Sequence, residues 1–493
     1  MRMPLAARLT LPARCVTATL LLFTLTVSVA AAPPDRSALP PLGPPPSLTL
    51  PAVQHRTLSN GLPVLVVEQH EVPVVQVSLV VTRGSADDPV GKYGIASLTT
   101  SLLTEGAGTR SSLELADAVD GLGADLSASA SSDALAVRLH VPVRQLEAAL
   151  PLMADVALRP TFPQAELDRV RQQRLTSLLQ ARDDAATVAS LALARTLYGP
   201  SHRFGTAAMG TAASLTAITG DDLRAYYAAA IRPDRSTLIV VGDVSVDQVV
   251  ATLDRAFGRW VAAPGRPLPA VTPPPLRTRT SRSVVLVDMP GAPQSQVRIG
   301  RVGVARGTAD YFPLQIMNTV LGGSFSSRLN MNLREVHGYS YGAGSSFDYR
   351  RLAGPFTASA GVQTDKTAPA LTEFLKELTA IARPVPDDEL ARARHYVALR
   401  FPGSFETTGD IARHLEEAVV YALPDDYFST VVPRLEAVSQ ADVQRVAAQY
   451  VTPQTMVVVV AGDRAAIEPG IRALGLGPVT LMTLDEVFGP ARP

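Results

Sequence analysis

An arginine and a tyrosine seven residues apart have side chains that could bind a peptide backbone. Arg334 and Tyr341 follow a glycine-rich stretch that contains Gly322, Gly323 and Ser324. A guanidinium stays protonated and offers several N–H donors, and a phenol adds a neutral donor, so the pair suits a peptide carbonyl or an oxyanion. The glycines would let a strand edge or turn approach a bound peptide backbone closely, and an extended peptide could add to that edge as an extra strand. From the spacing alone, the simpler interpretation is that Arg334 is a surface charge at a helix end and Tyr341 is an aromatic ring in the core.

Metal-binding and nucleophilic chemistry lack clear signs in the sequence. Of the seven histidines, no two are four residues apart, so none forms the usual helical zinc pair. Lone histidines are usually structural or surface groups, and a metal site assembled from distant residues stays open as the alternative. No Ser/His/Asp arrangement can be placed. A stand-alone enzyme with another mechanism therefore stays open but has no assigned residues.

The hydrophobic pattern places these residues in mixed strands and helices. Apolar, β-branched runs bounded by glycine or proline predict strands at 62–67, 74–81, 237–241 and 456–460. Amphipathic spacing predicts helices at 112–122, 164–181, 187–197, 388–399 and 408–422. Strands, then several helices, then a strand indicate an α+β layer, with helices on one face of a mostly antiparallel sheet.

The chain contains an internal repeat. Pro233 and Gly242 recur as Pro453 and Gly462, each 220 residues later, and two further blocks match in the same order. Two homologous halves joined by a proline-rich linker into a clamshell are therefore expected. The predicted domains are a signal peptide (1–32), a Pro-rich linker (33–50), an N-terminal domain (51–262), a second linker (263–282), a C-terminal domain (283–475) and a tail (476–493).

From about Leu58 to about Asp463 the chain resembles the insulinase/pitrilysin family of zinc peptidases. The resemblance is carried by the stretches Asn60-Gly61, Gly94-Ile95-Ala96 and Gly322-Gly323-Ser324-Phe325, and by Arg334 with Tyr341. In active members the helix after Gly-x-Ala carries His-x-x-Glu-His. Its histidines bind zinc, its glutamate polarises the attacking water, and a glutamate on a later helix completes the ligand set.

The resemblance implies a degenerate zinc site. The positions of the two histidines and the general base fall on Ser97, Thr100 and Ser101, and the later ligand falls on Ser177, with Thr176 the next candidate. A neutral alcohol is a poor zinc ligand beside imidazole or carboxylate. No metal or other cofactor is therefore expected in this chain, and the chain is expected to be inactive alone.

The resemblance also implies a function. Some bacterial members work as heterodimers in which one subunit carries zinc and the other carries the arginine and the tyrosine. We therefore expect a non-catalytic, substrate-binding subunit of a periplasmic metallopeptidase, with a zinc-bearing relative as partner and peptides as substrates. Arg334 and Tyr341, with Gly322, Gly323 and Ser324, would contact the substrate. The alternative is a peptide-binding or complex-assembly protein with no protease role.

Composition and the first residues predict where the protein acts. The chain has 45 basic and 45 acidic residues, which argues against a nucleic-acid partner. Arginines, the apolar run 16–29 and Ala30-Ala31-Ala32 are typical of a secretory signal. An uncleaved anchor stays open as the alternative, and no later stretch is expected to span a membrane. The only cysteine, Cys15, precedes the apolar run, so cleavage of the signal would remove it. The mature chain would then have no cysteine with which to form a disulfide in the periplasm.

Overall fold

The computed structural model describes residues 50–262 and 279–491. The predicted signal peptide, nearly all of the first linker, most of the second linker and the last two residues lie outside the described residues. None of the helices within the described residues is long and apolar enough to cross a bilayer.

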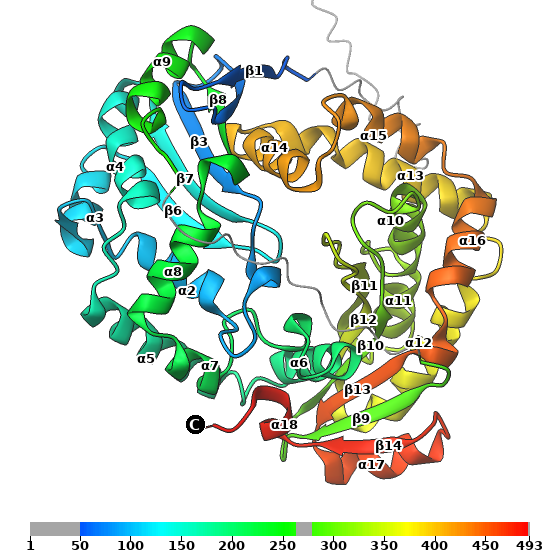
Figure 1. The fold of residues 1–493 in the computed structure, drawn as a ribbon. Helices are drawn as coiled ribbons and strands as arrows, with labels where there is room; N and C mark the ends of the chain where they lie inside the picture. The colour runs from blue at the N-terminus through cyan, green and yellow to red at the C-terminus, as the bar shows by residue number, and fades with distance from the viewer. Residues whose placement is uncertain (1–49, 263–278, 492–493) are drawn as a thin grey trace, which may run out of the picture. The chain divides into compact units, whose positions relative to one another are not determined.

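Two six-stranded sheets, one from each half of the chain, have the same strand order (Figure 1). The first sheet runs β1-β2-β8-β3-β7-β6, and the second, taken from its opposite end, runs β14-β9-β13-β10-β12-β11. Strands β8 and β13, which contain the sequence repeat, therefore occupy the same place. Most neighbouring strands are antiparallel, and the parallel pairs are β2 with β8, β9 with β13 and β9 with β14. The predicted duplication is confirmed.

The strands predicted at 62–67, 74–81, 237–241 and 456–460 are present, and their boundaries lie within two residues of the predicted ones. In the first half the strands are β1 (Gln54–Thr57), β2 (Pro63–Glu68), β3 (Val74–Val81), β6 (Asp125–Ala130), β7 (Leu135–Pro142) and β8 (Ser236–Gly242), with a small hairpin of β4 (Gly106–Ala107) and β5 (Arg110–Ser111). In the second half they are β9 (Ser283–Asp288), β10 (Gln294–Val302), β11 (Ser340–Phe347), β12 (Pro355–Gln363), β13 (Val457–Gly462) and β14 (Val479–Met482).

The five predicted helices are all present, and further helices complete each half. The first half contains α2 (Ile95–Leu103), α3 (Ser112–Asp120), α4 (Leu146–Leu158), α5 (Gln164–Gln180), α6 (Ala185–Tyr198), α7 (Ala212–Ala217), α8 (Gly220–Ala230) and α9 (Val246–Phe257). The second contains α10 (Tyr311–Leu321), α11 (Arg328–Asn330), the π-helix η5 (Met331–Val336), α12 (Thr367–Ala380), α13 (Asp387–Arg400), α14 (Thr408–Tyr421), α15 (Tyr427–Glu436), α16 (Gln440–Tyr450), α17 (Arg464–Ala473) and α18 (Leu484–Phe488).

The two halves exchange one helix each. Helix α6 of the first half packs on β10 and β13 of the second sheet, and α14 of the second half packs on β3 and β8 of the first (Figure 1). Each exchanged helix covers the sheet face opposite the main helical layer. Along β8, for example, Leu238 and Val240 belong to the main core, whereas Ile239 and Val241 contact α14.

This exchange explains why the central strands are apolar throughout. A strand buried on both faces needs apolar side chains at successive positions, not at alternate ones. The predicted fold class is confirmed, and the structure adds one helix to the second face of each sheet. Burial on both faces was visible in the sequence, but the origin of the second covering layer was not.

Candidate functional site

The start of helix α2 is held in place by a buried ion pair. The carboxylate of Asp88 accepts hydrogen bonds from the backbone N–H of Gly94 (2.7 Å) and of Ala96 (3.1 Å). Arg203 donates to the same carboxylate at 2.8 Å, and Asp88 is fully buried. Gly94 has φ 96°, and a Cβ there would lie 2.3 Å from the carbonyl oxygen of Met209. The Gly-x-Ala step is therefore required to place α2.

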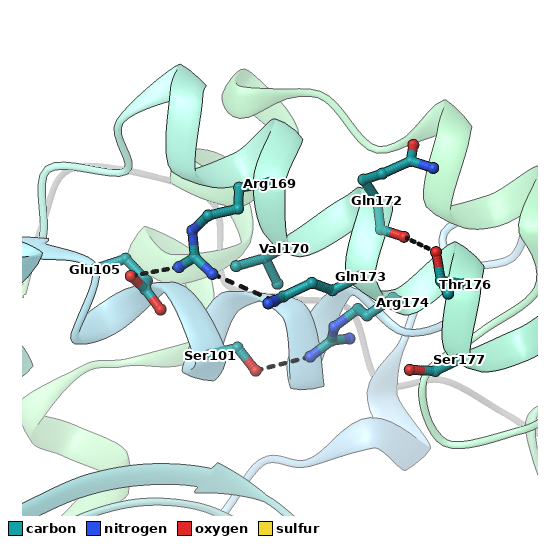
Figure 2. Close-up of a pocket in the computed structure, with 9 residues that line it drawn as sticks. All are labelled: Ser101, Glu105, Arg169, Val170, Gln172, Gln173, Arg174, Thr176 and Ser177. Carbon is teal, nitrogen blue, oxygen red and sulfur yellow. Dashed lines mark hydrogen bonds and ion pairs between the residues drawn. The ribbon is translucent and has the colours of Figure 1, made fainter.

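Helix α5 packs against α2 and directs an arginine onto two of the predicted zinc positions. Figure 2 shows its contact with one of them, Ser101. Nη1 of Arg174 donates to Oγ of Ser97 at 2.8 Å. Nη2 donates to the backbone oxygen of Ser97 at 2.7 Å and to Oγ of Ser101 at 2.8 Å. The face of α2 that resembles a zinc-binding face therefore contacts a guanidinium.

The charge of Arg174 has no carboxylate partner among the described residues. Its three hydrogen bonds go to two hydroxyls and one carbonyl. Removal from water lowers the pKa of Arg174 to about 10, and the charge of Asp88 opposes this shift. A base with that pKa is still protonated near neutral pH. A fixed positive charge therefore lies against α2.

The other two predicted positions have different surroundings. The Thr100 side chain is 3% exposed and its hydroxyl donates to the carbonyls of Ala96 (3.3 Å) and Ser97 (3.1 Å), within its own helix. Ser177 is exposed on α5, one turn beyond Arg174, and lines the same pocket as Ser101. The structure thus brings Ser97, Ser101 and Ser177 around Arg174 and leaves Thr100 apart.

These residues do not fit a zinc ion. Zinc in peptidases is bound by imidazole and carboxylate, whereas the predicted positions here carry alcohols, and two of them, Ser97 and Ser101, already accept hydrogen bonds from Arg174. The guanidinium would also repel a divalent cation at the same place. Within residues 50–262 and 279–491, no group of three or more His, Cys, Asp or Glu side chains is arranged to hold a metal.

Around this arrangement lies an open pocket of about 970 Å³ (Figure 2). Arg169 forms an ion pair across it with Glu105 at 2.7 Å, and a second with Glu166 at 2.6 Å. The charge of Arg169 is thereby neutralised within the chain. The pocket is lined by Ser101, Glu105, Arg169, Val170, Gln172, Gln173, Arg174, Thr176 and Ser177.

In the second half, Arg334 and Tyr341 lie on two elements that pack together, η5 and β11. Arg334 is half-exposed, its guanidinium lies 4.8 Å from the Phe325 ring centroid, and its Nε is 3.2 Å from Oε1 of Glu335. Tyr341 is 88% exposed and lies at a register shift of β11. Both side chains therefore remain available to a ligand, and Tyr341 is not the core ring that spacing alone favoured. Substrate contact stays a prediction.

The glycine-rich turn contacts its own chain. A Cβ on Gly322 would lie 2.2 Å from the backbone nitrogen of Ser345, and a Cβ on Gly323 would lie 2.8 Å from Nδ2 of Asn318. Ser324 donates to the carbonyl of Thr319 at 3.1 Å. Close approach within the protein accounts for both glycines, and their contact with a peptide remains a prediction.

The edge of β11 is already occupied, so the expectation that a peptide adds to it is wrong for its central part. The N–H of Ser345 donates to the carbonyl of Gly322 at 3.1 Å, and the N–H of Ala343 donates to Oδ1 of Asn330 at 3.2 Å. An added strand needs these outward N–H groups free.

Strand β6, one of the two edge strands of the first sheet, has an open edge. Ser131 N–H donates to the carbonyl of Ala134 at 2.8 Å and closes the β6–β7 hairpin, so alternate residues from there point their N–H groups outward. These are the N–H groups of Leu126, Ala128 and Ala130. Within the described part of the chain none of them has a backbone partner across the edge.

One sequence pattern invites a different interpretation. Residues 338–342 read Gly-Tyr-Ser-Tyr-Gly, which fits the Gly-x-Ser-x-Gly pattern of serine hydrolases. In those enzymes the serine lies between a strand and the helix that follows it. Here Ser340 comes after the π-helix and begins β11, and its hydroxyl donates to the carbonyl of Gly342 at 2.7 Å. The pattern is not a nucleophile elbow.

Arg174 is the functional residue that sequence reasoning missed. It lies three residues before Ser177, so it lies on nearly the same face of α5. A basic residue one turn from a predicted metal-ligand position was the available signal.

The fold and the site together define a duplicated, two-domain peptidase fold whose predicted metal-ligand positions are alcohols. A model of the insulinase family (Peptidase family M16) matches residues 63–230, and a model of the peptidase M16 inactive domain matches residues 217–397. The chain belongs to the M16 family, and it is a homologue of the non-catalytic type.

Named relatives and solved structures agree with the assignment to this family. The chain is 26% identical to an uncharacterized zinc protease of Mycobacterium leprae, over 66% of this chain and 73% of that protein. It is 23% identical to the non-peptidase homolog YmxG of Helicobacter pylori, over 80% and 90%. A crystal structure of a peptidase M16 inactive domain from Pseudomonas fluorescens matches with TM-score 0.76 and 28% identity, over 83% of this chain and 98% of that one.

Proposed function

We propose that this protein is the non-catalytic, substrate-binding subunit of a heterodimeric periplasmic peptidase, whose zinc is carried by a relative of the same family. The observation that carries this proposal is the position of the Arg174 guanidinium, which bonds to Ser97 and Ser101 where an active member would hold zinc. Hydrolysis then needs a metal site on another chain.

The open edge of β6 supports peptide binding. An extended peptide can add to a free strand edge through main-chain hydrogen bonds, which do not depend on peptide sequence. The side chains of β6 near its free edge are small: Ser127 and Ser129 are exposed, and they alternate with Ala128 and Ala130, which pack against the first core. Proteins often place lysine or proline on an edge strand to prevent the addition of another strand, and β6 contains neither residue.

Arg334 and Tyr341 support a contribution to the partner's reaction. Both are exposed and carry N–H or O–H donors on neighbouring elements. A guanidinium donor that reaches the partner's site would stabilise the oxyanion formed when zinc-activated water attacks a peptide bond. The periplasmic location is supported by the secretory character of the first 32 residues.

The test is reconstitution with a family member from the same genome that keeps His-x-x-Glu-His. The two chains, each expressed without its leader, are mixed and examined by size-exclusion chromatography and by turnover of a fluorogenic peptide. We expect a stable complex, with turnover well above that of the relative alone.

Two results would count against this function. Absence of a complex, together with turnover no higher than that of the relative alone, would contradict it. Peptide binding by the isolated chain with no effect on hydrolysis would instead favour the peptide-binding or complex-assembly alternative.

A further inference from the structure

We propose that the pocket around Arg174 binds a carboxylate of the bound peptide, so that the former metal site has become an anion site. This inference rests on the proposed peptide-binding function and adds to it a substrate class. The ligand chemistry is a carboxylate, supplied either by the C-terminus of the peptide or by an acidic side chain near that end.

The charge of Arg174 is the first reason. A guanidinium has five N–H donors, and three are used on Ser97 and Ser101, so two remain. The described residues supply no carboxylate to pair with it. An unpaired cation partly removed from water gains from an anion more than an exposed one does, because screening by solvent is weaker there.

The rest of the pocket supplies further donors. The side-chain oxygen of Gln173 accepts from Nη1 of Arg169 at 3.3 Å, which leaves its amide N–H groups for a ligand. The hydroxyl of Ser177 forms no hydrogen bond within the described residues. Glu105 is the one carboxylate among the lining residues, and it is paired with Arg169 at 2.7 Å. Repulsion of an incoming anion by Glu105 is thereby reduced.

The position of the pocket beside β6 is the second reason. Helix α2 packs on β6, and Glu105, just beyond α2, lines both this pocket and a second hollow of about 500 Å³. That second hollow includes Asp125 and Leu126 of β6. A peptide paired with the edge of β6 therefore lies next to the route to Arg174. Its carboxylate can bind Arg174 while its backbone pairs with the strand.

The experiment uses the full mature chain and one fluorescent peptide in three forms. These are the free acid, the C-terminal amide, and an amide whose last residue is glutamate. Dissociation constants are measured by fluorescence anisotropy for wild type, Arg174→Gln and Arg174→Lys. The control is Arg224→Gln, which removes an exposed charge that is paired with Asp221 outside the pocket. N-acetylglycine and N-acetylglycinamide are titrated calorimetrically as small probes.

We expect the free acid to bind wild type and Arg224→Gln roughly tenfold or more tighter than the plain amide, as for a charge-assisted hydrogen bond. The preference should vanish in Arg174→Gln and be kept in part by Arg174→Lys. If only the free acid binds more tightly than the plain amide, the carboxylate comes from the peptide C-terminus. If the glutamate amide binds as tightly as the free acid, an acidic side chain is sufficient. If Arg174→Gln does not fold, the carboxylate site is tested by the acid-over-amide preference of Arg174→Lys and by the binding of the small probes to wild type.

Equal binding of the acid and amide forms to wild type would overturn the carboxylate site and leave peptide binding intact. A preference that persists in folded Arg174→Gln would also overturn it. Conversely, N-acetylglycine binding that depends on Arg174, without binding of any peptide, would retain the anion site and contradict the proposed function. No binding of any probe would contradict both.

Discussion

Nη1 of Arg174 lies 2.8 Å from Oγ of Ser97, and that hydrogen bond joins helix α5 to the face of α2 that binds zinc in active relatives. This contact gives the site a property beyond the lack of metal ligands. The site holds a positive charge supplied by the chain, and hydroxyls that cannot bind zinc well are good acceptors for a guanidinium. Hydroxyls at the predicted ligand positions and an arginine beside them are therefore chemically consistent with each other.

The first prediction concerns zinc binding by a restored site. The variant Ser97→His, Ser101→His, Ser177→Glu recreates the three ligands but keeps Arg174 in place. We expect zinc affinity to rise by roughly 10²-fold or more when Arg174→Ala is added, because two charges of the same sign about 4 Å apart repel strongly outside bulk water. Isothermal titration with zinc measures the difference.

Wild type and the single variant Arg174→Ala serve as controls and should bind no zinc at this site. Equal zinc affinity of the restored site with and without Arg174 would show that the guanidinium does not occupy the metal position.

The second prediction concerns Arg334. In the reconstituted heterodimer, Arg334→Ala should lower kcat by about 10²–10³, the usual cost of removing an oxyanion donor. Complex formation should be unchanged, because Arg334 is half-exposed and its contacts with Glu335 and Phe325 lie within its own half. Steady-state kinetics and size-exclusion chromatography separate the two effects. Arg392→Ala, which removes an exposed arginine paired with Asp388, is the matched control.

Unchanged kcat in Arg334→Ala, with the complex intact, would remove this residue from the reaction.

The third prediction concerns the free edge of β6. Ala128→Pro removes an outward N–H in the middle of the strand without removing a donor to β7. We expect peptide affinity to fall by about tenfold, since a main-chain hydrogen bond is lost and the ring obstructs the edge. Ala128→Val keeps the N–H and should bind like wild type. Anisotropy with a labelled peptide measures both, and equal loss in the two variants would indicate that the edge is not the binding site.

The fourth prediction concerns the exchanged helix α14. Nε of Arg138 on β7 donates to Oε1 of Glu416 on α14 at 2.8 Å, and Glu416 is 7% exposed. Arg138→Ala should lower the free energy of unfolding by about 2 kcal/mol, because it leaves a buried carboxylate without its cation; the estimate is reduced for the partial exposure of Arg138. Urea denaturation gives the value.

The matched comparison is Arg255→Ala, which breaks an ion pair with Glu147 in which both side chains are well exposed. Its effect should stay within about 0.5 kcal/mol. Similar losses in the two variants would mean that the contact between β7 and α14 contributes no more than a surface pair.

Much of the fold could be predicted from local patterns. Strand β3 has the predicted limits, and α5 and α14 each end one residue before the predicted limit, because hydrophobic periodicity and caps are local in sequence. The exchange of α6 and α14 could not be predicted. The apolar face of α6 contacts β10 and β13, far from it in sequence, and nothing local specifies which sheet covers that face.

Strands β6 and β11 show the same limit. Both lie at a sheet edge and are rich in serine and in alanine or glycine, and neither sequence indicates whether its edge is free. Only the fold brings Gly322 and Asn330 against β11 and leaves β6 open. The sequence expectation of strand addition at the second half was therefore wrong, since hydrogen-bond partners distant in sequence decide which edge is free.

By itself, the sequence determined the duplicated α+β architecture and the alcohols at the predicted zinc-ligand positions Ser97, Ser101 and Ser177, because periodicity and side-chain chemistry are properties of the residues themselves. The tertiary structure alone decided what stands in their place. Arg174 is separated from Ser97 by 77 residues, and the packing of α5 on α2 brings its charge to those hydroxyls. Contacts of that separation depend on how whole elements pack, which no local pattern encodes.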